Sequence, residues 1–149
     1  MKIYLGADHN GFAMKNQLRD SLRKLGYDVE DEGDEQLNLE DDFPQFASKV
    51  VNALKLSDDS AAKAILICGS GQGMCMAANR YKGIRASLCW DEVEARASRN
   101  DDDSNVLCLP ARYIDSNRAE AIAKVWLEMA FAGAPRFKRR IRELDEIGG

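Results

Sequence analysis

The chain has 149 residues, of which 45% are hydrophobic, which suits one globular domain over residues 1–149 and excludes a disordered protein. Its formal charge of −4 and its pI of about 5.1 argue against a general nucleic-acid-binding protein, which needs a basic face. No apolar run approaches the roughly 20 residues that span a bilayer, and the first residues lack the layout of a signal peptide. We therefore expect a cytoplasmic protein without a membrane-spanning helix.

Short apolar runs alternate along the chain with segments whose apolar residues recur at helical spacing. Gly26 marks the end of the first helix, and Pro44 fits the first turn of the next. The continuous apolar run 64–68 is typical of a central strand, whereas the partly polar run from Tyr27 suits an edge strand. The predicted elements are, in chain order, strand 3–5, helix 11–25, strand 27–29, acidic loop 31–41, helix 44–56, strand 64–68, helix 73–81, strand 84–89, helix 91–99, strand 106–109, helix 116–131 and a basic helical segment over 132–149.

Five strands that alternate with helices predict right-handed βαβ units and hence a parallel sheet. We therefore expect a three-layer αβα domain of Rossmann-like type, with a five-stranded parallel sheet and a C-terminal helical tail. Ligands of such folds bind outside the carboxyl ends of the strands. Several polar motifs of this chain follow a predicted strand and fall at that edge.

A glycine-rich loop over residues 68–73, of sequence CGSGQG, joins the predicted central strand to a helix. Its glycines let the backbone approach a ligand, and its N–H groups favour an anion such as a phosphate or an enediolate. Beside such donors the thiolate of Cys68 would be favoured, and it could take a proton from a carbon next to a carbonyl. Because the spacing matches neither a Walker loop nor the full dinucleotide fingerprint, a tight structural turn remains the alternative.

Polar residues also follow the first and the last predicted strands. Asp8 can orient a sugar hydroxyl or move its proton, and an imidazolium at His9, the only histidine, can hold a phosphate. Arg136 and Arg140 lie four residues apart and share one helix face, which suits a phosphate dianion. Arg112, just after the fifth strand, could complete that cluster. A structural histidine and a solvated basic face are the alternatives.

The four cysteines form no Cys-x-x-Cys pair, and with a single histidine they predict no structural zinc site and no other metal centre. Cys89 and Cys108 stand in apolar, strand-like runs. We expect both of them to be buried and to act as small hydrophobic side chains.

Taken together, the motifs resemble the type B ribose-5-phosphate isomerase and galactose-6-phosphate isomerase family. The matching segments are Gly6–Phe12, Ile65–Met74, Ala77–Arg80, Gly83–Ala86, Asn105–Leu107, Arg112, Gly133, Arg136 and Arg140. The resemblance implies interconversion of a phosphorylated aldose and its ketose through a cis-enediolate, with ribose 5-phosphate and ribulose 5-phosphate as the first choice and no cofactor. It also implies homodimers or dimers of dimers with shared active sites, so the segment 132–149 is expected to pack on a partner subunit.

Within this resemblance, Cys68 takes the position of the base that moves a proton between C1 and C2, and Ser70 takes that of a loop hydroxyl. Asp8 stands where the family handles ring opening and hydroxyl protons. The N–H groups of the anion hole belong to Gly69, Gly71 and Gly73, and the phosphate-binding positions are His9, Arg112, Arg136 and Arg140.

Three positions depart from the family pattern, and the first two of them matter most for the sugar ring. Asp101 replaces a histidine that aids ring opening, Asp102 replaces an asparagine of the site, and Phe43 stands where a tyrosine is usual. Imidazole exchanges protons near neutrality, whereas a carboxylate is normally ionised. Either Asp101 acts as a base because burial favours its protonated form, or the substrate differs. A tetrose 4-phosphate, which cannot close a furanose ring, and a hexose 6-phosphate are the other substrates considered.

Two other classes of function compete with an isomerase. A non-catalytic sugar-phosphate-binding subunit, paired with an active paralogue, would not need the intact Cys68, Asp8 and Ser70. A nucleotide-binding Rossmann domain would carry its glycine motif after the first strand rather than the third, with different spacing.

Overall fold

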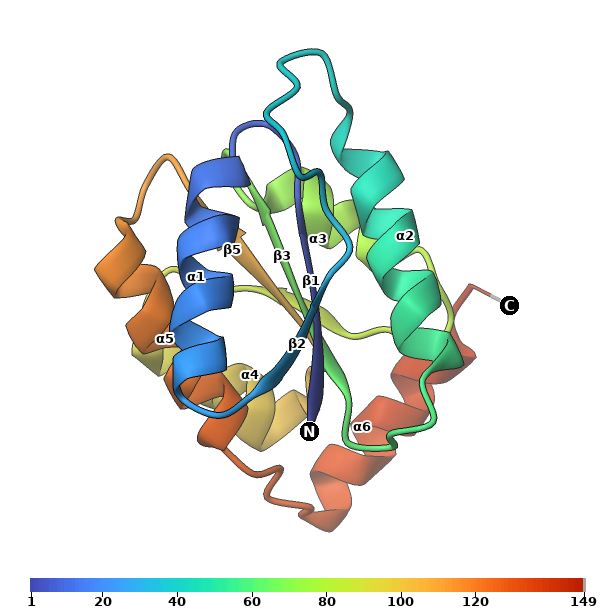
Figure 1. Ribbon diagram of the computed structural model, residues 1–149. Coiled ribbons are helices and arrows are strands. Elements are labelled where there is room, and N and C mark those ends of the chain that lie inside the picture. The colour runs from blue at the N-terminus through green and yellow to red at the C-terminus, as the bar shows by residue number, and fades with distance from the viewer. Residues whose placement is uncertain (149) are drawn as a thin grey trace.

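The computed structural model describes residues 1–148 and shows a parallel sheet between two layers of helices (Figure 1). The strands are β1 (Lys2–Ala7), β2 (Asp28–Asp31), β3 (Lys63–Cys68), β4 (Ala86–Leu88) and β5 (Val106–Pro110). They lie in the order β2-β1-β3-β5-β4, and every neighbouring pair is parallel. The predicted three-layer fold is confirmed, with β3 at the centre of the sheet and β2 at an edge.

Six helices connect and follow these strands in the described residues. They are α1 (Phe12–Lys24), α2 (Phe43–Leu56), α3 (Gln72–Ala78), α4 (Glu92–Asp102), α5 (Ser116–Glu128) and α6 (Pro135–Glu146). Gly26 adopts a φ of 93° just after α1, as expected of a glycine that ends a helix.

Several predicted boundaries are wrong. The helix expected over 73–81 ends as α3 at Ala78 because the chain turns at residues 79–80. The helix expected over 116–131 ends at Glu128 because Met129 is extended, with φ −79° and ψ 121°. The strand expected over 84–89 is reduced to β4, since the Asn105 side chain accepts the N–H of Arg85 at 2.8 Å before the ladder begins. The helix expected to end near residue 99 continues as α4 to Asp102.

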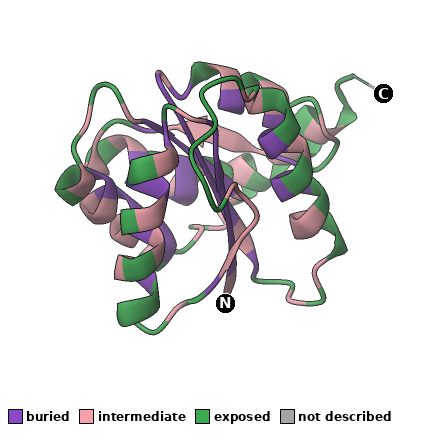
Figure 2. Cartoon of the chain, turned by 45° about the horizontal axis from the view of Figure 1, so that its top comes forward, coloured by how far each residue is buried: buried purple, intermediate pink, exposed green. Residues whose placement is uncertain are grey.

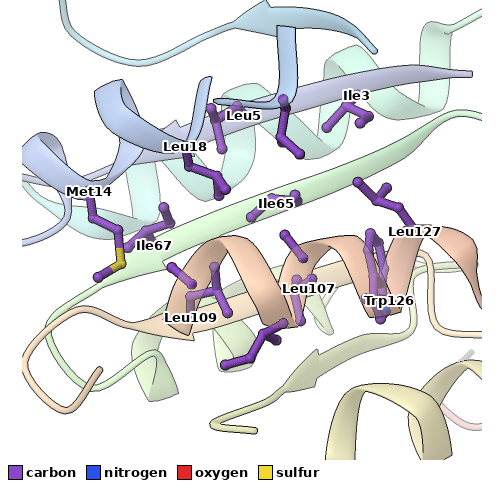
Figure 3. Close-up of a cluster of buried hydrophobic side chains, with 14 of the residues drawn as sticks. Ile3, Leu5, Met14, Leu18, Ile65, Ile67, Leu107, Leu109, Trp126 and Leu127 are labelled. Carbon is purple, nitrogen blue, oxygen red and sulfur yellow. The ribbon is translucent and has the colours of Figure 1, made fainter. Parts of the chain in front are cut away.

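The two faces of β3 build two apolar cores, because successive strand side chains point to opposite faces. Ile65 and Ile67 pack with residues of α1 and α5, among them Leu18 and Trp126 (Figure 3). Leu66 and its neighbours on the other face pack against α2 and α3, and Cys68 belongs to this second core. Figure 2 shows the buried strands between half-buried and exposed helices. Cys89 and Cys108 are fully buried, as predicted.

The last helix differs from the other five. None of the residues of α6 is buried, and its main neighbour among the elements is α4. Among residues 1–148, no helix combines the length and the apolar character that crossing a membrane requires.

Candidate active site

The carboxyl ends of β1, β3 and β5 are bonded to one another through the backbone. The N–H of Asp8 donates to the carbonyl of Ile67 at 3.3 Å, and the N–H of Arg112 donates to the carbonyl of Gly69 at 2.9 Å. This edge brings together eight of the predicted site residues, the carboxyl-edge group: Asp8, His9, Cys68, Gly69, Ser70, Gly71, Gly73 and Arg112.

Cys68 is the last residue of the central strand and is 5% exposed. The loop after it turns at Gly71, whose φ of 75° lies in the left-handed region that favours glycine. A Cβ atom at Gly69 would lie 3.0 Å from Cζ of Arg112, so this guanidinium covers the loop backbone. Ser70 Oγ accepts the N–H of Gln72 at 3.4 Å. The loop thus places a thiol, backbone donors and a cation in one small region.

The Asp8 side chain is 4% exposed and is held by the turn that follows β1. Its Oδ1 accepts the N–H groups of Asn10 at 3.0 Å and Gly11 at 3.2 Å. These bonds fix the direction of the carboxylate. They also explain why an aspartate suits this turn.

His9 is bound to a residue that the sequence did not single out. Oδ1 of Asp41, in the loop before α2, accepts both the backbone N–H of His9 at 2.9 Å and its Nδ1–H at 2.8 Å. The bond from Asp41, together with the charges of Asp8 and Asp41, raises the pKa of His9 above its ordinary value of 6.5, while desolvation of the ring opposes the shift. The imidazolium form that binds phosphate is therefore favoured.

Asp8, His9 and Asp41 also bring one donor atom each within 4.8 Å of one another, the only such grouping of metal-ligating side chains within residues 1–148. Nδ1 of His9 is bonded to Asp41, and Oδ1 of Asp8 is bonded to two N–H groups. We interpret the grouping as a hydrogen-bonded His9–Asp41 pair beside the turn that holds Asp8.

The other four predicted residues, the amino-edge group, lie at the opposite edge of the sheet: Asp101, Asp102, Arg136 and Arg140. α4 starts after β4 and runs back, so its last residues precede the first residue of β5. Cys68 is in register with Pro110, at the far end of β5 from Val106. At about 3.3 Å per residue these two ends are about 13 Å apart. One chain therefore does not bring Arg136 and Arg140 to Arg112, which the sequence analysis considered as a candidate member of their cluster.

Within the amino-edge group, Asp101 accepts a hydrogen bond from the Asn100 side chain at 2.8 Å. Partial burial and the charge of Asp101 raise the pKa of Asp102, while Arg140 and Arg85 oppose that shift. A cavity of about 670 Å³ lies here, between the turn before β4 and the ends of α4 and α6. Asp102 lines it, but no member of the carboxyl-edge group does, so this cavity is separate from that group.

Comparison with known proteins covers nearly the whole chain. The family model described as Ribose/Galactose Isomerase matches residues 3–144. A probable ribose-5-phosphate isomerase B of Mycoplasma genitalium is 36% identical over 95% of this chain and 92% of its own length. A D-erythrulose-4-phosphate isomerase of Pectobacterium atrosepticum is 33% identical over 93% and 92%, respectively.

Solved structures of proteins with a similar level of sequence identity have the same fold as this chain. A ribose 5-phosphate isomerase from Thermotoga maritima has a TM-score of 0.92 at 39% identity and covers 98% of both chains. The ribose-5-phosphate isomerase B of Mycoplasma genitalium with bound ribulose-5-phosphate has a TM-score of 0.90 at 36% identity, covering 97% of this chain and 93% of its own. The chain therefore belongs to the ribose/galactose isomerase family and is an enzyme of the sugar-phosphate isomerase class.

Proposed function

We propose that this enzyme interconverts ribose 5-phosphate and ribulose 5-phosphate, with Cys68 as the base. The observation that carries the proposal is the position of Cys68 at the end of the central strand, directly before the loop that Gly71 turns and Arg112 covers. A thiolate there needs only to reach the hydrogen on C2 of an open-chain aldose.

The proposed step conserves atoms and electrons. The Cys68 thiolate takes the proton from C2, and the C–H electron pair forms the C1–C2 double bond of a cis-enediolate. The N–H groups of Gly69, Gly71 and Gly73 stabilise the negative oxygen, since donors fixed in advance cost little reorganisation. The thiol returns the proton to C1 while the hydroxyl proton of O2 passes to O1, so that C2 becomes the carbonyl carbon of the ketose. Ser70 and Asp8 transfer the hydroxyl protons and take part in opening the sugar ring.

The phosphate would bind at a distance from the thiol. His9 and Arg112 supply cations from the carboxyl-edge group. Arg136 and Arg140 would come from a second copy of the chain, with Asp101 and Asp102 near the sugar ring. This arrangement is supported by α6, whose residues are all at least partly exposed and whose two arginines find no place at the carboxyl edge of their own chain. A homodimer, or a dimer of dimers, would join the two groups.

A tetrose 4-phosphate is the second candidate substrate. Two observations favour it: Asp101 stands where an imidazole is usual, and one relative bears the name D-erythrulose-4-phosphate isomerase. A tetrose 4-phosphate closes no furanose ring because its O4 is esterified, so it needs no ring-opening group.

Cys68→Ala tests the reaction. We expect the isomerisation rate to fall by about 10³-fold, the range of a lost general base, while circular dichroism and the unfolding midpoint stay unchanged. Cys75→Ala makes the same thiol-to-methyl change in the adjacent helix and should retain activity. Deuterium uptake from solvent at C1 or C2 checks the same step directly.

Three outcomes would contradict the proposal. Near-normal turnover by Cys68→Ala would remove Cys68 as the base. Binding of ribose 5-phosphate by the natural protein without deuterium uptake would indicate a binding subunit. Faster turnover of erythrose 4-phosphate than of ribose 5-phosphate would show that the tetrose phosphate is the substrate, and the proposed proton transfer by Cys68 would stand.

A further inference from the structure

The acidic segment between β2 and α2 has a defined structure at the carboxyl edge of the sheet. It stands at the top of Figure 1, beside the turn that follows β1. Its start is anchored by Lys15 of α1, which is fully buried and whose Nζ contacts both carboxylate oxygens of Asp31 at 3.0 and 3.1 Å and the carbonyl of Asp34 at 2.8 Å. Its end leads into α2, and Asp41 lies just before that helix.

Asp41 reaches inward from this segment. Its side chain is 6% exposed, whereas that of His9 is 28% exposed. One oxygen, Oδ1, accepts the backbone N–H and the ring Nδ1–H of the same histidine. Two bonds to one oxygen fix the position of the ring and its tautomer, so that Nε2 is left to face a ligand. Neither bond is local, since 32 residues separate the partners.

We propose that Asp41 is a positioning residue for phosphate binding, which orients His9 and keeps its imidazole cationic at the pH where the substrate phosphate is a dianion. The proposal rests on the proposed function, because it takes His9 as a phosphate contact. It adds a residue from outside the motifs that carry the family resemblance.

The charges around the ring give the sign of the effect. Asp8, at the end of β1, and Asp41, in the loop before α2, are the charged groups that act on His9, and both favour the imidazolium. A phosphate monoester loses its second proton near pH 6. The pairing of a cation with a dianion therefore exists between about pH 6 and the pKa of His9. Raising that pKa widens the range upward.

The test uses Asp41→Asn, which keeps an oxygen acceptor and removes the charge. His9 is the only histidine, so its imidazole signals in NMR spectra need no assignment. In the free protein we expect the His9 pKa to fall toward 6.5 in Asp41→Asn. Asp42→Asn removes a neighbouring charge that does not act on the ring and should leave the His9 pKa unchanged.

Steady-state kinetics with ribose 5-phosphate give the second readout. KM of Asp41→Asn should rise by about tenfold, the size of one charge-assisted hydrogen bond, at pH values between the two measured imidazole pKa values. KM of the two proteins should converge near pH 5.5, where both imidazoles are cationic, and kcat should change by less than about twofold. A variant that was merely misfolded would not recover at low pH.

The two proposals fail separately. An unchanged His9 pKa in Asp41→Asn, or an equal shift in Asp42→Asn, would overturn the role of Asp41 whatever the reaction is. A fall in kcat at constant KM would do the same. If the natural protein turned over no sugar phosphate, the proposed function would fail. The role of Asp41 would then be tested alone, by adding inorganic phosphate and recording the His9 signals. Unchanged His9 signals would overturn that role.

Discussion

The carboxyl-edge group and the amino-edge group are held by the fold in different ways. Asp8 and Cys68 are 4% and 5% exposed and stand at the ends of strands that are bonded to one another. Arg136 and Arg140 are exposed on a helix without a buried residue. The groups that we propose to move protons are therefore placed by the core of one chain. The arginines on α6 depend, in our account, on what that helix packs against.

After Cys68→Ala, the largest effect is expected when the arginines of the amino-edge group are removed. Arg136→Ala combined with Arg140→Ala should lower kcat/KM for ribose 5-phosphate by about 100-fold or more, since each charged hydrogen bond contributes about 1.5–3 kcal/mol. The free energy of unfolding of one chain should change little. Substitution of two other exposed α6 cations, Lys138 and Arg142, by alanine is the control, and an equal loss there would indicate a general charge effect.

The next largest effect, on the free energy of unfolding, is expected at Lys15, which anchors the acidic segment at the carboxyl edge. Lys15→Met should destabilise the chain by about 3 kcal/mol at pH 7, because it leaves the largely buried Asp31 carboxylate with Arg19 alone. Urea unfolding measures this, with Lys24→Met on the exposed part of the same helix as the control. A loss of equal size in both variants would contradict this interpretation of the buried pair.

The pH dependence of that pair has a definite sign. Although burial opposes it, the bonds from Gly33, Lys15 and Arg19 hold the pKa of Asp31 below its ordinary value of 3.8. A lowered folded pKa stabilises the protein above the unfolded pKa, and the stability is lost as pH falls through the folded value. The difference between the natural protein and Lys15→Met should therefore shrink toward pH 3.

The smallest effect is expected at the sugar ring. Asp101→His restores an imidazole at the amino edge and should raise the rate with ribose 5-phosphate by several-fold, within the range of one added acid–base group. The rate with erythrose 4-phosphate, which needs no ring opening, should stay the same. Equal changes with both substrates would show that Asp101 does not act on the ring.

The sequence predicts the central strands better than the edges and the helix ends. β3 and β5 lie within one residue of their expected bounds and β1 within two, because their continuous apolar runs are buried on both faces. β4 and the end of α5 differ because contacts distant in the sequence decide them: Asn105 binds Arg85, and the N–H of Ala132 donates to the carbonyl of Asn100.

The carboxyl-edge group could be predicted from the sequence in the same way. Parallel strands bring their carboxyl ends to one edge, so Asp8, Cys68 and Arg112 could be placed together from the sequence. The separation of Asp101 follows as well, because a helix that leads into a parallel strand ends at the amino edge, and Asp101 precedes the strand that begins at Val106. Asp41 gave no signal, since nothing in the run of acids before Pro44 distinguishes it from Asp42.

The most direct test of the account joins the two groups across two chains. Cys68→Ala and the Arg136→Ala/Arg140→Ala double variant are each nearly inactive in our account, and they are unfolded and refolded together in equal amounts. If each site takes Cys68 from one chain and the arginines from its partner, half of the dimers are mixed and each has one intact site, which restores about one quarter of the natural rate. A mixture no more active than its two parents would show that the site is not shared, and would contradict the account.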